Sequence, residues 1–242
     1  MEDLKTIRMM PDEIQIWFAG MDDQLTDVHK YEAVLSPVEI SRAQRFYQLR
    51  DRNRYVVKHG ILRILLSYYA GSHPGQIQIH SSSSGKPYLS NQSDNGSLQF
   101  SISDSDGLVL FAFGRHTMVG VDIERVIELP EMEEIVVSHF TNREKREFTS
   151  YPESERLYLF YKYWTRKEAV LKAAGEGLLR PLDCVNVTAT GDGFKTWRVR
   201  IGGTALREFS IRDMECPKGY MAAVSAASHF SRIAVHQFHA GR

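Results

Sequence analysis

The stretch FSISD at residues 100–104 returns in nearly the same form as FSIRD at residues 209–213, and this pair decides how we divide the chain. Around it, a capping box, in which Ser or Thr is followed three residues later by Glu, begins at Ser36 and again at Thr141. In each half the box precedes a long helical pattern, a turn and strand patterns, in the same order. A repeat of this length predicts two similar lobes with a ligand cleft between them.

The hydrophobic patterns predict the elements of each lobe. We expect an α+β fold of two pseudo-symmetric lobes, each a small antiparallel sheet packed with helices, divided as residues 1–117 and 118–242. The first lobe would hold a strand at 14–19, a helix beginning at Pro37, a helix over 54–69, a turn at 81–87 and strands at 100–103 and 108–113. The second would hold a strand at 119–124, a helix after Thr141, a helix over 155–174 ended by glycines, and strands at 183–189, 196–201, 208–213 and 220–226.

Composition excludes several classes of protein. The 242 residues are 43% hydrophobic and 25% charged, and 30 basic residues balance 30 acidic ones. A nucleic-acid binder usually carries an excess of basic residues, so we do not expect this protein to bind nucleic acid. The two cysteines have neither a metal-type spacing nor a disulfide pattern, which predicts free thiols in a reducing compartment. The N-terminus lacks an apolar signal region and no apolar run approaches a membrane span, so we expect a cytoplasmic protein.

The hexapeptide VGVDIE at residues 119–124 is the first candidate for chemistry. Side chains alternate along a strand, so its two Val residues and its Ile share a core face. Asp122 and Glu124 share the opposite face, about 7 Å apart along the backbone. Gly120 would leave that face open beside them. The pair could hold one cation, although the hexapeptide by itself favours an edge strand with a solvated acidic face.

The stretch WTRKEAVLK at residues 164–172 is the second candidate. On a helix Glu168 and Lys172 lie one turn apart, which by itself indicates an ordinary surface ion pair. A third carboxylate close to Asp122 and Glu124 would change that interpretation. Three carboxylates suit Mg²⁺, which also binds substrate phosphate oxygens, and a neighbouring lysine suits a phosphorylated substrate.

Taken together, VGVDIE and WTRKEAVLK resemble the two signature motifs of the Sfp-type 4′-phosphopantetheinyl transferases. The resemblance extends over roughly residues 35–226. It includes LSPVE at 35–39, RAQRF at 42–46, the helical stretch at 54–66, GKP at 85–87 and FSIS at 100–103. Matching motifs in both halves make it specific.

The resemblance implies a monomer that transfers phosphopantetheine from coenzyme A to a serine of an apo acyl or peptidyl carrier protein and releases 3′,5′-ADP. The first lobe would bind the nucleotide side of coenzyme A, and the second would carry the metal and the catalytic helix. Glu168 would be the catalytic base and Lys172 would contact the phosphates. Mg²⁺ would be held by Asp122, Glu124 and Glu168, and coenzyme A by Arg54, Gly85, Lys86, Pro87 and Ser103.

One departure from the family pattern concerns Asp104. The family commonly has a phosphate-contacting histidine at this position, and Ser101 also replaces the usual Asn. An aspartate beside a pyrophosphate is repulsive unless a cation lies between them, so Asp104 is a candidate contact that needs explanation. Two alternatives stay open. The departure at Asp104 keeps open a coenzyme A-binding module without catalysis. The same three carboxylates would also serve a metal-dependent hydrolase of nucleotide pyrophosphates.

Overall fold

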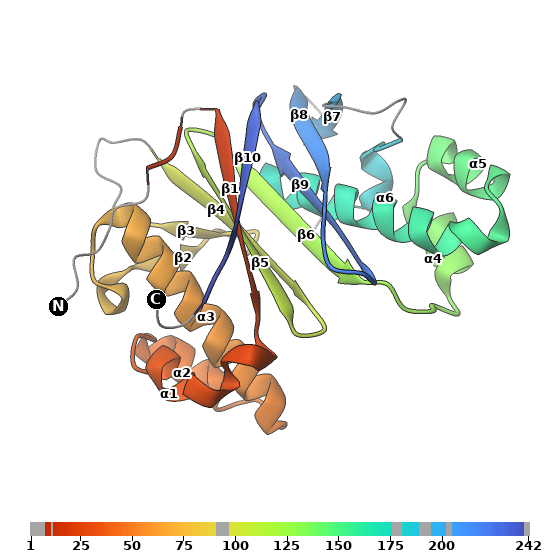
Figure 1. Ribbon diagram of the computed structural model, residues 1–242. Helices are drawn as coiled ribbons and strands as arrows, with labels where there is room; N and C mark the ends of the chain where they lie inside the picture. The colour runs from red at the N-terminus through yellow and green to blue at the C-terminus, as the bar shows by residue number, and fades with distance from the viewer. Residues whose placement is uncertain are drawn as a thin grey trace.

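The computed structural model describes residues 8–10, 12–90, 97–175, 181–188, 195–201 and 205–239. Its strands form two four-stranded sheets and one two-stranded hairpin (Figure 1). The first half contains β1 Glu13–Gly20, α1 Val28–Glu32, α2 Pro37–Ala43, α3 Leu49–Ala70, β2 Ile79–Ser81, β3 Pro87–Leu89, β4 Leu98–Ser105 and β5 Leu108–Arg115. The second contains β6 Val119–Arg125, α4 Met132–His139, α5 Asn142–Ser150, α6 Glu153–Ala174, β7 Lys195–Ile201, β8 Ala205–Met214, β9 Tyr220–Ala226 and β10 Arg232–Gln237.

The two halves repeat one architecture, as the sequence predicts. The order β1-β5-β4 in the first sheet matches β6-β9-β8 in the second, and both sets of strands are antiparallel. The long helices α3 and α6 lie against the first and the second sheet respectively (Figure 1). Both helices have 22 residues and end at a glycine with positive φ, Gly71 and Gly175. The predicted α+β fold of two similar lobes is therefore confirmed.

A buried cation holds the first lobe together. Ser36 and Glu39 form the predicted capping box at the start of α2. The Glu39 carboxylate also accepts a 2.7 Å bond from Nε of Arg63, which is 3% exposed. The Arg63 guanidinium in turn donates to the backbone carbonyls of Pro74 and Ile77. One side chain of α3 thus ties a helix start to the segment that follows α3.

The second lobe repeats this arrangement with a lysine. Thr141 and Glu144 form the capping box of α5, and the Glu144 carboxylate lies 2.7 Å from Nζ of Lys167. Lys167 stands at the same position in α6 as Arg63 in α3, the fifteenth of the helix. Its ammonium also donates to the carbonyls of Leu182 and Val185. Lys167 and Glu144 are both fully buried.

One expectation about the second half needs correction. The predicted strand at 183–189 is wrong over its described part, which is a short 3-10 turn, Leu182–Cys184, followed by extended chain up to residue 188. The backbone here bonds to the side chains of Lys167 and Glu144, which leaves less of it for a strand ladder. The last strand, β10, pairs in parallel with β1 and so belongs to the first sheet, while the division of the chain at residue 117 stays a prediction.

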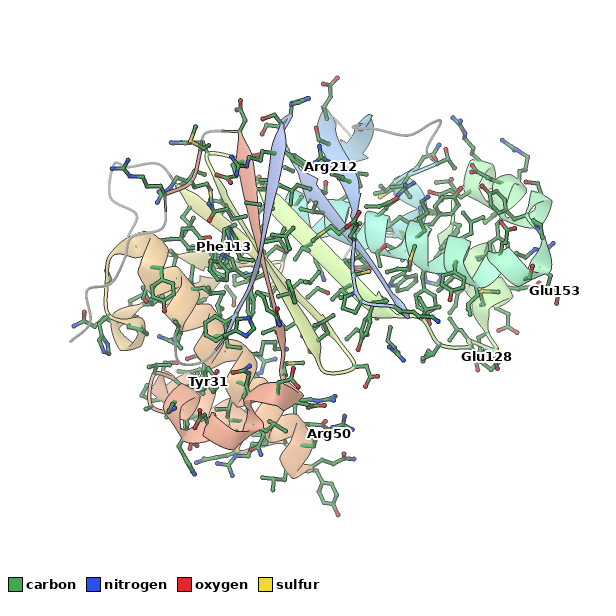
Figure 2. All side chains as sticks on the ribbon, in the orientation of Figure 1. Tyr31, Arg50, Phe113, Glu128, Glu153 and Arg212 are labelled. Carbon is green, nitrogen blue, oxygen red and sulfur yellow. The ribbon has the colours of Figure 1, made fainter. Side chains whose placement is uncertain are left out.

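Tyr31 shows how the shorter elements pack on α3. Its side chain is 1% exposed in the first core cluster (Figure 2). A Cβ on Gly60 would lie 2.5 Å from the Cβ of Tyr31, so only glycine lets α1 approach α3 this closely. Sequence patterns did not predict α1, α4 or β10. Among the described residues, no helix has the length and apolar character that crossing a membrane requires.

Removing the buried cation of the second lobe should destabilise the protein strongly. Lys167→Met leaves the Glu144 carboxylate buried without its ion-pair partner, which should lower the free energy of unfolding by about 3–5 kcal/mol. Urea denaturation measures this. Lys30→Met, at the exposed Lys30–Asp27 pair, is the control and should cost at most about 1 kcal/mol. Equal losses in the two variants would contradict the structural role of Lys167.

Candidate functional site

The acidic strand β6 lies where the two lobes meet. Val119, Val121 and Ile123 are fully buried in a cluster shared with the first sheet, as the alternating pattern predicts. Asp122, on the opposite face, is only 3% exposed. The interpretation of this face as a solvated edge is therefore wrong for Asp122.

The sequence predicts that Gly120 leaves the acidic face open beside Asp122 and Glu124, but the structure gives it another role. A Cβ at this position would collide with the carbonyl oxygen of Ala169 and the backbone nitrogen of Ala173 in α6. The missing side chain therefore makes room for a helix rather than for a ligand. Because α6 packs directly on β6, Glu168 and Lys172 come close to Asp122.

Lys172 forms its ion pair across the boundary between the lobes. Its ammonium lies 2.7 Å from Oδ1 of Asp122 and donates a 2.9 Å bond to Oγ of Ser103 on β4. The Ser103 hydroxyl donates in turn to the same Asp122 oxygen at 2.8 Å. Three elements, β4, β6 and α6, therefore meet at one carboxylate. The ion-pair partner of Lys172 is therefore Asp122 rather than Glu168, the partner in an ordinary surface pair along the helix.

Burial makes the three carboxylates of the site costly when charged. It raises the pKa of Asp122, although Lys172 and Ser103 act against the shift. Burial also raises the pKa of Glu124 and of Glu168, and the charge of Asp122 raises both further. Oδ2 of Asp122 and Oε1 of Glu168 are buried without a hydrogen-bond partner among the described residues. A cation between these groups would relieve both the repulsion and the missing contacts.

These donors fit Mg²⁺ better than a metal that needs a complete protein cage. Among the described residues, no three acidic, His or Cys side chains gather closely enough to form such a cage. Mg²⁺ typically takes one or two carboxylates and completes its shell with water and substrate phosphate oxygens. The two unpartnered oxygens of Asp122 and Glu168 match that requirement.

A cleft of about 600 Å³ lies between the lobes beside this site. Its size suits a cofactor-sized ligand. The first lobe forms most of its wall, and Lys172 of α6 and Gly175, which follows α6, contribute from the second. The other lining residues are Arg42, Phe46, Tyr55, Lys58, His59, Ser84, Gly85, Lys86, Pro87, Phe100, Ser101, Ile102 and Asp104.

Lys86 lines this cleft, but its ammonium is already engaged. It donates to the backbone carbonyls of Lys172 at 2.8 Å and of Val119 and Ala173 at 3.2 Å each. These three bonds use all the donors of an ammonium group. Burial lowers the pKa of Lys86 to about 8. The predicted turn therefore lies where expected, with Gly85 and Pro87 in the wall, while the Lys86 side chain anchors the hairpin to the end of α6.

Arg54 lies outside the main cleft, in a neighbouring hollow that Lys58 and Asp104 also line. Its guanidinium donates two bonds to the Asp22 carboxylate, Nε at 2.7 Å and Nη2 at 2.5 Å. The hydrogen bond from Arg54 lowers the pKa of Asp22 to about 2. Sequence reasoning did not identify Asp22 as the partner of Arg54.

Alternate serines of β4 form a further feature that the sequence analysis missed. Oγ of Ser101 accepts from the backbone N–H of Val121, and Oγ of Ser105 donates to Glu124 at 2.9 Å. With Ser103 they face β6 in a row, so side chains join two strands that belong to separate sheets. The alternation of serine in FSISDS, residues 100–105, is the signal that could have indicated this row.

His59, which lines the cleft, should make stability depend on pH. Its Nδ1 lies 2.9 Å from the Tyr55 carbonyl and its ring stacks on Tyr55. Burial, followed by the charge of Lys58, lowers the pKa of His59 from 6.5 to about 4. The folded state thus favours the neutral ring, so this stabilisation is complete above pH 6.5 and is lost as the pH falls towards 4.

Urea denaturation at pH 7 and pH 4.5 tests this dependence. His59→Gln should show a smaller loss of stability between the two pH values than the unmodified protein. His29→Gln, at a side chain that is 97% exposed, should keep the full loss. A His59→Gln variant with an unchanged pH dependence would contradict the assignment.

Two family models match the chain, one in each half. The model of the 4′-phosphopantetheinyl transferase superfamily matches residues 118–225. The model of the N-terminal part of 4′-phosphopantetheinyl transferases matches residues 23–115. The first match covers Asp122, Glu124, Glu168 and Lys172, and the second covers most of the cleft wall.

Individual relatives agree with these matches. The 4′-phosphopantetheinyl transferase HetI of Nostoc is 33% identical over 174 residues, which cover 72% of this chain and 73% of HetI. The 4′-phosphopantetheinyl transferase Sfp of Bacillus subtilis is 27% identical over 216 residues, 88% of this chain and 92% of Sfp. The human L-aminoadipate-semialdehyde dehydrogenase-phosphopantetheinyl transferase is 24% identical over 205 residues, 79% of this chain and 66% of the relative.

Proposed function

Since this chain belongs to the 4′-phosphopantetheinyl transferase family, which acts with coenzyme A on carrier proteins, we propose that it modifies a serine of an apo acyl or peptidyl carrier protein with the help of Mg²⁺. The chain is a transferase of phosphopantetheine. One observation carries the metal-assisted form of the proposal. Asp122 and Glu168 each keep a buried oxygen without a partner, beside Lys172 and next to a large cleft.

Coenzyme A would lie along the cleft with its nucleotide between α3 and the β2–β3 hairpin. Gly85 and Pro87 form this wall, and Lys86 keeps it in place through the end of α6. Arg54 would exchange its pairing with Asp22 for the 3′-phosphate. The pyrophosphate would point towards Lys172 and Ser103, which share a hydrogen bond. Both lobes of one chain complete the cleft, which supports the predicted monomer.

The three predicted ligands, Asp122, Glu124 and Glu168, do not enclose a metal ion by themselves, so phosphate oxygens and water would complete the shell of the Mg²⁺ that they hold. When bound, it neutralises charge on the phosphate oxygens that react. Ser103 and Ser105 orient the two carboxylates of β6 through their hydroxyl groups. Lys172 balances the charge of Asp122 and is close enough to contact a phosphate in the cleft.

Glu168 is the proposed base. A serine hydroxyl is a weak nucleophile, so its proton must pass to a neighbouring group as it attacks. A carboxylate can accept this proton, and Oε1 of Glu168 has no hydrogen-bond partner among the described residues. The serine oxygen forms a bond to the phosphorus that carries pantetheine, and the bond from that phosphorus to the bridging oxygen breaks. The proton stays on Glu168, 3′,5′-ADP leaves, and Lys172 stabilises the charge on the phosphate oxygens.

Intact mass spectrometry of an apo carrier protein tests this reaction. Incubation with the enzyme, coenzyme A and Mg²⁺ should add about 340 Da to the carrier, and EDTA should abolish the gain. Glu168→Gln should lower the rate by at least about a hundredfold while the fold persists, because the amide cannot accept the proton. An active Glu168→Gln enzyme would exclude this base.

The same experiment separates the two alternatives. Cleavage of coenzyme A without a gain in carrier mass would indicate a pyrophosphohydrolase. Binding of coenzyme A with neither cleavage nor transfer, across acyl and peptidyl carriers, would indicate a module without catalysis. The predicted cytoplasmic location stays a prediction.

Asp122→Asn tests the metal ligands separately from the chemistry. The amide keeps the shape of the side chain but loses the charge that a divalent cation requires. Calorimetry should show that Mg²⁺ lowers the Kd of coenzyme A for the unmodified protein. In Asp122→Asn the factor by which Mg²⁺ lowers this Kd should be at least about tenfold smaller. Asp106→Asn, on the exposed β4–β5 turn, is the control. A variant whose binding still responds fully to Mg²⁺ would remove Asp122 from the ligand set.

A further inference from the structure

Asp104 is paired with Lys58, a residue of α3. Nζ of Lys58 lies 2.7 Å from Oδ1 of Asp104, and the two side chains are 22% and 35% exposed. Both line the main cleft and the neighbouring hollow that contains Arg54. The pair therefore stands where the two spaces adjoin.

This pairing removes the electrostatic problem that Asp104 poses. A lone carboxylate in a cleft for a phosphorylated ligand would repel the ligand, whereas a paired one adds no net charge. An ammonium has three donors, and among the described residues Lys58 uses only one, towards Asp104. The two others are available to an acceptor in the cleft.

The other cations of the cleft are placed differently. Lys86 donates to three backbone carbonyls, and Lys172 donates to both Asp122 and Ser103. Arg42 lies over the ring of Tyr55, 6.0 Å from its centroid. Lys58 is thus held in position by Asp104 and, among the described residues, keeps two N–H donors that are not used.

The internal repeat contains a matching pair in the second lobe. Lys162 is the tenth residue of α6, as Lys58 is of α3, and it lies 3.6 Å from Asp213, which ends the FSIRD stretch. Asp213 is held mainly by two bonds from Arg166, at 2.6 and 2.5 Å. The matching position in α3 is Leu62, so among the described residues Asp104 is held by Lys58 without a second cation.

Building on the proposed function, we infer that Lys58 binds a phosphate group of coenzyme A and that Asp104 is the residue that positions it. In both lobes a lysine of the long helix pairs with the aspartate that ends the repeated strand motif. In the first lobe it also presents a cation to the ligand. Asp104 then does not contact the phosphate itself but positions Lys58, which does.

Binding of coenzyme A to four variants tests this inference by calorimetry. Lys58→Met should raise Kd about tenfold to a hundredfold, because a cation is lost and the Asp104 carboxylate is left uncompensated. Asp104→Asn should raise Kd less, since the cation remains. The double variant Lys58→Met/Asp104→Asn should bind better than Lys58→Met alone, because the repulsive charge is gone. Lys162→Met, the matched change in the second lobe, should alter Kd less than about twofold.

Dephospho-coenzyme A, which lacks the 3′-phosphate, identifies the group that Lys58 meets. If the effect of Lys58→Met disappears with this ligand, the contact is the 3′-phosphate, and if it persists, the contact is the pyrophosphate. A Lys58→Met protein that binds coenzyme A as tightly as Lys162→Met would overturn the inference and leave the pair a structural tie. An unmodified protein that binds no coenzyme A would instead overturn the proposed function.

Discussion

The site depends on the backbone contact between α6 and β6 at Gly120. Any side chain at this position would collide with the Ala169 carbonyl and separate the helix from the strand. The contact brings the face of α6 that carries Glu168 and Lys172 onto the acidic strand, so that Lys172 reaches Asp122 at 2.7 Å. It also buries the carboxylates, which raises the pKa values of Asp122, Glu124 and Glu168 and creates the need for a cation. Packing and chemistry therefore have one geometric origin.

The two lobes share a structural plan but not their chemistry. A capping-box glutamate and a buried cation hold the same two segments together in each lobe, through Arg63 in one and Lys167 in the other. The positions of α3 that correspond to Glu168 and Lys172 of α6 are Ile64 and Tyr68. The candidate carboxylates therefore lie in the second lobe, while the first lobe supplies most of the cleft wall. The Lys58–Asp104 pair of the first lobe is an element of this shared plan that lines the cleft.

Side chains rather than a backbone ladder join the lobes at the site. Ser101, Ser103 and Ser105 connect β4 to β6 although the two strands belong to different sheets. Such hydroxyl bonds satisfy the buried polar groups and set the positions of Asp122 and Glu124 at the same time. The parallel pairing of β10 with β1 adds a second connection, because the end of the chain returns to the first sheet.

The sequence by itself determined what depends on neighbours along the chain. Both capping boxes, the glycine that ends α6 and the alternation of VGVDIE follow from local geometry, and the repeat implied two similar lobes. Only the tertiary structure decided which polar groups meet. It engaged Lys86 with three carbonyls, paired Arg54 with Asp22 and Lys58 with Asp104, and turned the segment after Leu182 away from a strand. Long charged side chains can reach many partners, and their choice depends on contacts between residues far apart in the sequence, which no local pattern specifies.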